Sequence, residues 1–120
     1  MRRASTKIRR APRIRSTRLR GVLGDMKELL RREIGDGFRL ILFGSHARNE
    51  GKPDSDVDLM VILPDNRYRF EVREQVRDLV YGLSFRSDYL LSVMIVSESM
   101  AREHAGFQVF AAIEKEGVPL

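Results

Sequence analysis

The stretch LFGSHARNEGKPDSDVDLMVIL, residues 42–63, has a Gly-Ser pair at the end of one apolar run and two aspartates at the start of the next. Aspartate is a poor strand residue. Asp56 and Asp58 are two positions apart, so on a strand they leave the same face and repel each other unless a positive charge lies between them. Two adjacent carboxylates can chelate Mg²⁺, a cation that prefers oxygen ligands and fills its shell with phosphate and water. We therefore expect Asp56 and Asp58 to bind a metal–nucleotide complex.

The Gly-Ser pair offers the complementary half of such a site. Gly44 permits a sharp exit from the strand and lets a phosphate approach the backbone. We expect Ser45 to be the N-cap of a short helix, whose first amides and dipole favour an anion. Arg48 could contact phosphate, or could equally lie on a solvated helix face. His46 and His104 are isolated from other metal-binding residue types, and we expect both at the surface.

Composition and charge place limits on the function. The 120 residues contain no cysteine, which excludes disulfides and thiolate chemistry and is consistent with a reducing cytoplasm. No apolar run approaches the roughly 20 residues of a membrane span, and we expect no membrane partner. Nine of the 22 basic residues and no acid lie within residues 1–20, so the rest of the chain is acidic by −4. We expect a basic, disordered arm over residues 1–15 and one domain over residues 16–120.

Hydrophobic periodicity gives the order of elements in that domain. Apolar residues at helical spacing predict a helix from Ser16 to the Gly-Asp-Gly at 35–37, and another over residues 66–84. Apolar runs predict strands over residues 38–43, 57–63 and 89–97, followed by short helices over 98–105 and 107–116. The helix between the second and third strands predicts that these two run parallel. The fold class is therefore α/β (α+β), with a small three-stranded mixed sheet and flanking helices.

The two motifs together resemble a known family. Gly44-Ser45, ten residues and then Asp56-x-Asp58 is the G-S-x10-D-x-D arrangement of the DNA polymerase beta-like nucleotidyltransferases. Residues 17–120 resemble the minimal nucleotidyltransferases, the antitoxin half of HEPN–MNT toxin–antitoxin pairs. The resemblance implies the fold of that superfamily and transfer of AMP from ATP, or NMP from another NTP, to a tyrosine of a HEPN toxin. It also implies two Mg²⁺ ions on the aspartates, with Gly44 and Ser45 on the β- and γ-phosphates.

The resemblance further implies a third acid on the next strand, acting as base or metal ligand. Asp88, entering the run 89–97, is the available candidate, since parallel strands would place it beside the start of the second strand. In an alternative alignment Ser92 takes this position and the third carboxylate is missing.

Two other functions remain open. Without a third acid, the domain could neutralise a toxin by binding alone. Residues 1–20 could bind nucleic acid through their positive charge, with a steep salt dependence, although they contain no aromatic residue to stack on bases.

Overall fold

The computed structural model describes residues 14–120. The predicted arm over residues 1–15 therefore falls almost wholly outside the described residues. Its last two residues pack on the domain: Ile14 is 7% exposed, and the Arg15 backbone N–H donates to Asn49 Oδ1 at 2.9 Å. The packed structure thus extends at least to Ile14, two residues before the predicted boundary.

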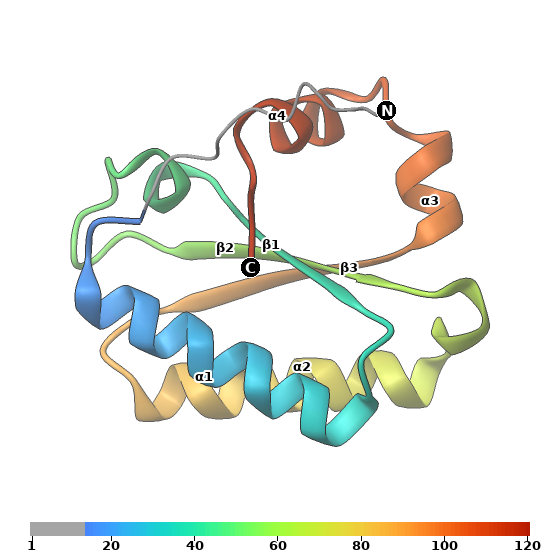
Figure 1. Ribbon diagram of the computed structural model, residues 1–120, viewed down its shortest axis with the longest axis horizontal. Helices are drawn as coiled ribbons and strands as arrows, with labels where there is room; N and C mark the ends of the chain where they lie inside the picture. The colour runs from blue at the N-terminus through green and yellow to red at the C-terminus, as the bar shows by residue number, and fades with distance from the viewer. Residues whose placement is uncertain (1–13) are drawn as a thin grey trace, which may run out of the picture.

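The order of helices and strands follows the sequence-based prediction closely (Figure 1). The elements in chain order are α1 (Thr17–Ile34), β1 (Arg39–Phe43), the 3-10 helix η1 (Ser45–Arg48), β2 (Val57–Leu63), the 3-10 helix η2 (Asp65–Arg67), α2 (Phe70–Arg86), β3 (Leu91–Ser97), α3 (Glu98–Glu103), α4 (Gln108–Glu116) and β4 (Val118–Pro119). The predicted helix over 66–84 divides into η2 and α2, because Tyr68 and Arg69 leave helical geometry between them.

The four strands form one mixed sheet in the order β3-β2-β1-β4. β1 pairs antiparallel with β2, and β2 pairs parallel with β3, as predicted. The prediction of three strands was wrong by one, since β4 pairs antiparallel with β1. β4 has only two residues and ends in Pro119, which lacks a backbone donor and is tolerated because the strand lies at an edge of the sheet.

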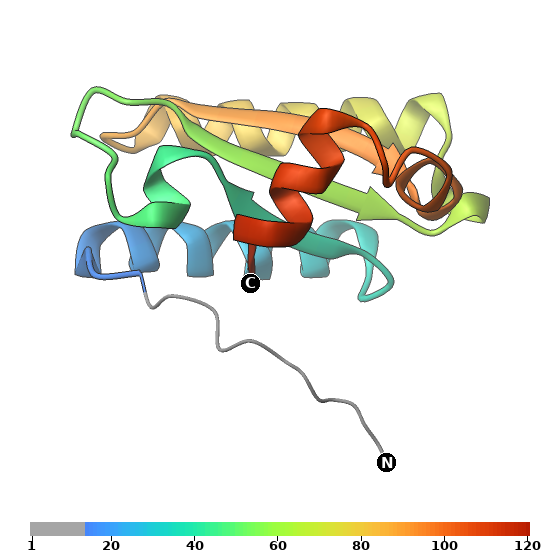
Figure 2. The same cartoon turned by 90° about the horizontal axis from the view of Figure 1, so that it is seen from above.

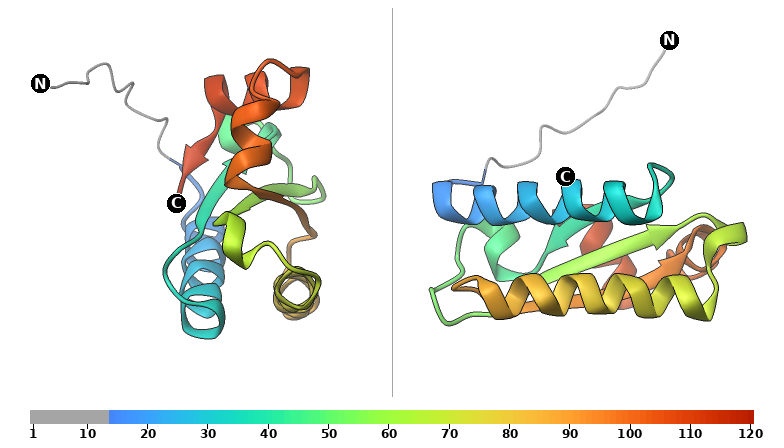
Figure 3. Two further views of the ribbon diagram at one scale, coloured as in Figure 1. Left: turned by 90° about the vertical axis from the view of Figure 1, so that its right-hand side faces the viewer. Right: turned by 90° about the horizontal axis from the view of Figure 1, so that it is seen from below.

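Helices cover both faces of the sheet. α1 and α2 lie side by side against one face, and α3 and α4 lie over the other (Figures 1 and 3). β2 alternates between the two: Leu59, Val61 and Leu63 belong to the core under α1 and α2, whereas Met60 and Ile62 face the smaller apolar cluster under α3 and α4. By the same alternation, Asp58 shares the α3–α4 face of the sheet.

The long helices are held by caps and apolar stripes. The Ser16 side chain caps α1 by accepting a hydrogen bond from the Leu19 backbone N–H at 3.1 Å. The buried stripe of α1 consists of Leu19, Leu23, Met26, Leu30 and Ile34, and that of α2 of Val72, Val76, Val80 and Leu83. Within residues 14–120, no helix combines the length and the apolarity that a membrane crossing requires.

Candidate functional site

The loop that contains Gly44 and Asp56 connects the C-terminal end of β1 to the N-terminal end of β2. These two ends are adjacent because the strands are antiparallel. Gly44 leaves β1 with φ 80° and ψ −161°, a region that side-chain-bearing residues essentially do not enter. η1 follows at once, with Gly44 rather than Ser45 as its N-cap residue. The prediction that Ser45 caps this helix was wrong: Ser45 is its first residue, and the Ala47 N–H donates to the Gly44 carbonyl at 3.1 Å.

Gly44 and Asp58 are in direct contact. The antiparallel register pairs Phe43, the last residue of β1, with Asp58, which brings the carboxylate beside Gly44. A Cβ placed on Gly44 would collide with a carboxylate oxygen of Asp58 and lie 3.2 Å from its Cγ. The absence of a side chain at Gly44 therefore creates the space that the acid occupies.

Asp56 and Asp58 interact through their charges. Asp56 is exposed and lies just before β2, whereas Asp58 is half-buried within it. The pKa of Asp58 is raised, first by burial and then by the negative charge of Asp56, and the nearby His46 opposes the shift. The structure thus brings together four of the predicted site residues, namely Gly44, Ser45, Asp56 and Asp58.

The structure does not bring Asp88 to this group. Asp88 precedes β3 and its Oδ2 forms an ion pair with Arg18 Nη1 of α1 at 3.0 Å, with both side chains more than 70% exposed. The parallel register instead places Ser92 opposite Asp58, and Ser92 is exposed. Across residues 14–120, no group of three or more His, Cys, Asp and Glu residues is arranged to bind a metal.

Arg48 is engaged by carboxylates. Its Nε lies 2.9 Å from Glu50 Oε1, and its Nη1 lies 3.0 Å from Glu116 Oε1 at the end of α4. The hydrogen bonds that Arg48 donates to these two acids raise its pKa. The ion pair between Arg48 and Glu116 thus links η1 to the end of α4.

His46 is a residue that sequence reasoning placed wrongly. It was expected at the surface, but only 7% of it is exposed. Its ring lies among the residues of the loop that carries Asp56: Nε2 is 3.2 Å from the Ser55 carbonyl oxygen, and a Cβ on Gly51 would collide with the ring. The only sequence signal for this burial was Gly51, five residues after His46, and a glycine by itself predicts only a turn.

Mg²⁺ fits the donor set at this end of the sheet. The ion is commonly bound by one or two carboxylates while substrate phosphates and waters complete its shell. Asp56 and Asp58 supply two mutually repelling carboxylates. The contact between Gly44 and Asp58 leaves the backbone of the Gly-Ser turn beside them, where a phosphate could approach.

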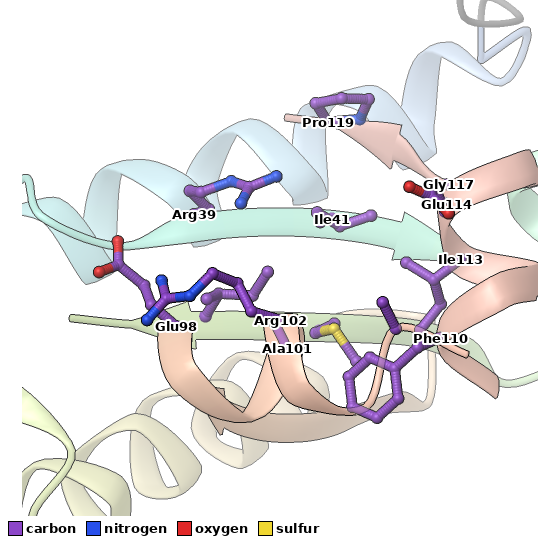
Figure 4. A pocket seen from close by; sticks show the side chains of 13 residues that line it. Arg39, Ile41, Glu98, Ala101, Arg102, Phe110, Ile113, Glu114, Gly117 and Pro119 are labelled. Carbon is purple, nitrogen blue, oxygen red and sulfur yellow. The ribbon is translucent and has the colours of Figure 1, made fainter. Parts of the chain in front are cut away.

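A separate groove lies on the same side of the sheet, under α3 and α4 (Figure 4). Its volume is about 580 Å³, its floor includes Ile41, Met60 and Ile62, and Arg39 and Arg102 are among its charged residues. None of the predicted site residues lines this groove. As seen from above, α4 lies between η1 on one side and α3 on the other (Figure 2).

Two basic residues near the start of the described chain form contacts within the domain. Arg18 pairs with Asp88, and Arg20 donates to the Ile14 carbonyl at 2.7 Å. The rest of the proposed nucleic-acid-binding segment, residues 1–13, lies outside the described residues.

Comparisons with known proteins bear on the family and the fold. The family model of the nucleotidyltransferase domain matches residues 19–112. No curated protein sequence matches the chain.

Among solved structures, a provisionally assigned nucleotidyltransferase from Sulfolobus solfataricus has a TM-score of 0.52 at 15% identity, covering 85% of this chain and 80% of its own. A toxin–antitoxin structure with AMP-PNP has a TM-score of 0.51 at 19% identity, covering 79% of this chain and 69% of its own. At these identities the two structures show a shared fold. The family model spans both motifs and most of the chain, so this protein belongs to the nucleotidyltransferase domain family.

Proposed function

We propose that the protein is a Mg²⁺-dependent nucleotidyltransferase that moves a nucleoside monophosphate, AMP from ATP, to a hydroxyl acceptor. The observation that carries this proposal is the contact between Gly44 and Asp58, with Asp56 close enough to raise the Asp58 pKa. This contact places the Gly-Ser turn and the carboxylate pair at the same end of β1 and β2. The family match supports transferase chemistry in general.

Each residue has a separate role in this proposal. Asp56 and Asp58 would bind two Mg²⁺ ions, and the Gly44–Ser45 turn would bind the β- and γ-phosphates through backbone amides and the Ser45 hydroxyl. When bound, Mg²⁺ supplies charge stabilisation of the triphosphate and activation of the acceptor oxygen. The acceptor oxygen would form a bond to the α-phosphorus and lose its proton to water. The bond from that phosphorus to the oxygen that bridges to the β-phosphate would break, and pyrophosphate would leave.

We further propose that the acceptor belongs to a toxin, as a tyrosine of a HEPN-type partner, and that the protein acts as its antitoxin. Support comes from the resemblance of the G-S-x10-D-x-D segment and from the shared fold with a toxin–antitoxin structure. Addition of AMP would then silence the toxin covalently.

Transfer of label tests this function. The purified protein, incubated with α-labelled ATP, Mg²⁺ and a folded HEPN toxin, should label a tyrosine of the toxin. Asp56→Ala and Asp58→Ala should each abolish labelling. Asp54→Ala is the matched control, because Asp54 is an exposed acid of the same loop, and it should label as wild type does. Absence of label with the wild-type protein would refute the catalytic proposal.

A second candidate function is neutralisation of a toxin by binding alone. The observation that favours it is the register of Ser92 with Asp58, together with the pairing of Asp88 with Arg18, which leaves two acids at the site. The two functions differ in cells that express the toxin. Asp56→Ala should still protect such cells if binding is sufficient, and should fail to protect them if transfer is required.

A further inference from the structure

Asp56 and Asp58 are positioned by different means. Asp58 lies within β2 and is fixed by the ladder with β1, where it pairs with Phe43. Asp56 lies before the first residue of β2, in the loop that follows η1. On its C-terminal side the chain is fixed by the Val57 N–H, which donates to the Leu90 carbonyl at 2.8 Å. On its N-terminal side, Ser55 is held in a turn with Lys52: the Ser55 N–H donates to the Lys52 carbonyl at 2.9 Å, and Ser55 Oγ accepts from the Lys52 N–H at 3.0 Å. These bonds fix the shape of the turn, and its placement relative to η1 requires a further contact.

His46 supplies a contact at that point. Its Nε2 lies 3.2 Å from the carbonyl oxygen of Ser55. A carbonyl oxygen can only accept, so Nε2 must carry the hydrogen and donate it. That carbonyl belongs to the peptide unit that joins Ser55 to Asp56, and the hydrogen bond therefore orients the plane from which Asp56 projects.

The imidazole ring is itself held on several sides. Gly51 approaches so closely that a Cβ there would collide with three ring atoms. The Tyr89 ring meets it edge-on, with centroids 6.0 Å apart and planes at 88°. With 7% of the residue exposed, the ring has little freedom to turn.

His46 also follows Ser45 directly in η1. The short helix is closed by the Asn49 N–H, which donates to the His46 carbonyl at 3.2 Å, and by the Glu50 N–H, which donates to the Ser45 carbonyl at 2.9 Å. A displacement of the ring would thus change the placement of the Gly-Ser turn relative to the loop acid.

We propose that His46 is a positioning residue that clamps the loop acid Asp56 to the Gly44–Ser45 turn, and so sets the separation between the metal-binding and phosphate-binding halves of the site. This inference rests on the proposed function for its consequence in binding, but the clamp itself is a property of the nucleotide-free protein.

The binding test uses the affinity for Mg²⁺ with a non-hydrolysable ATP analogue bridged by methylene between the α- and β-phosphates. His46→Leu replaces the imidazole with an apolar side chain that has no donor, and we expect it to raise the Kd about tenfold. His46→Gln retains an amide N–H that can reach the Ser55 carbonyl, and should restore the Kd to within about threefold of wild type.

His104 provides a matched control. It is the other histidine of the chain, and its Nδ1 likewise lies 2.9 Å from a backbone carbonyl oxygen, that of Met100. His104→Leu removes the same kind of hydrogen bond in the region of α3 and α4, and should leave the Kd unchanged. An equal loss of affinity in His104→Leu and His46→Leu would overturn the proposal, because a general loss of stability would then explain both.

Two readouts do not depend on nucleotide binding. Histidine ¹⁵N spectra of the wild type should show the Nε2–H tautomer at His46, and amide exchange at Asp56 and Val57 should be faster in His46→Leu than in wild type or His104→Leu. Gly51→Ala keeps the imidazole but displaces it, and should give the same faster exchange if His46→Leu does not fold. If the wild type binds no nucleotide, the proposed function fails, and the exchange result alone decides the clamp. Unchanged exchange in both variants would refute it.

Discussion

Gly44→Ala is a substitution whose effect can be worked out in two separable parts. Gly44 has φ 80° and ψ −161°, a backbone conformation that costs a residue with a side chain about 1–3 kcal/mol. The added methyl group would also collide with the Asp58 carboxylate, and relief of such overpacking typically costs about 1–3 kcal/mol more. We therefore expect a loss of about 2–6 kcal/mol in the free energy of unfolding.

Urea denaturation followed by circular dichroism measures this loss. With a slope of about 2 kcal/mol per molar urea, the middle of the usual range, the midpoint should fall by roughly 1–3 M. Gly24→Ala is the matched control: Gly24 is exposed in α1 with open space around it, and alanine there should raise stability by about 0.8–1 kcal/mol through helix propensity.

A double-mutant cycle separates the collision from the backbone strain. In an Asp58→Ala background the carboxylate is gone, so Gly44→Ala should retain only the backbone part of its cost, about 1–3 kcal/mol. An identical cost of Gly44→Ala in both backgrounds would show that the glycine and the acid are not in contact, and would refute the geometry of the site.

Three further predictions follow from the same structure. Because the pKa of Asp58 is raised, the folded state holds that proton more tightly than the unfolded state, and this group's contribution to stability falls as pH rises through the raised pKa. In Mg²⁺-free buffer at pH 7, Asp58→Asn should therefore need more urea to unfold than wild type does. This difference in urea midpoint should shrink toward pH 4. A difference that does not depend on pH would contradict the raised pKa. Ser92→Asp adds a third carboxylate opposite Asp58, and should lower the Kd for Mg²⁺ roughly tenfold, as measured by calorimetry. The uncharged Ser92→Asn is the control, and an equal change of Kd in both variants would exclude a charge effect. Ser16→Ala removes the α1 N-cap bond to Leu19 and should cost about 1 kcal/mol in urea unfolding, while no change would show that the cap is dispensable.

Local sequence pattern was sufficient for the strands and helices whose apolar residues repeat regularly. The predicted strand over 57–63 matches β2 to the residue, because a run that is apolar apart from Asp58 is bounded by Asp56 and Pro64. β4 escaped prediction because two residues carry no periodicity. Its existence depends on pairing with β1, a contact between distant parts of the chain.

The same distinction applies to the site. Gly44, Asp56 and Asp58 could be brought together from sequence because each stands at the end of a strand, where spacing and alternation fix direction. The choice between Asp88 and Ser92 could not be made, since it requires the register of β3 against β2 to within a few residues, and hydrophobic pattern leaves strand ends uncertain by that amount. The burial of His46 depends on how the loop to Asp56 folds back, which local propensity does not encode.

The central claim is that the Gly-Ser turn and the two aspartates form one site for a Mg²⁺–nucleotide complex. Calorimetric titration of the full chain with the non-hydrolysable ATP analogue, with and without Mg²⁺, tests it most directly. We predict binding that requires Mg²⁺, that weakens at least tenfold in the Asp56→Asn, Asp58→Asn double variant, and that persists in Asp54→Asn. Equal affinity of the double variant and the wild type, or binding that does not depend on Mg²⁺, would contradict the claim.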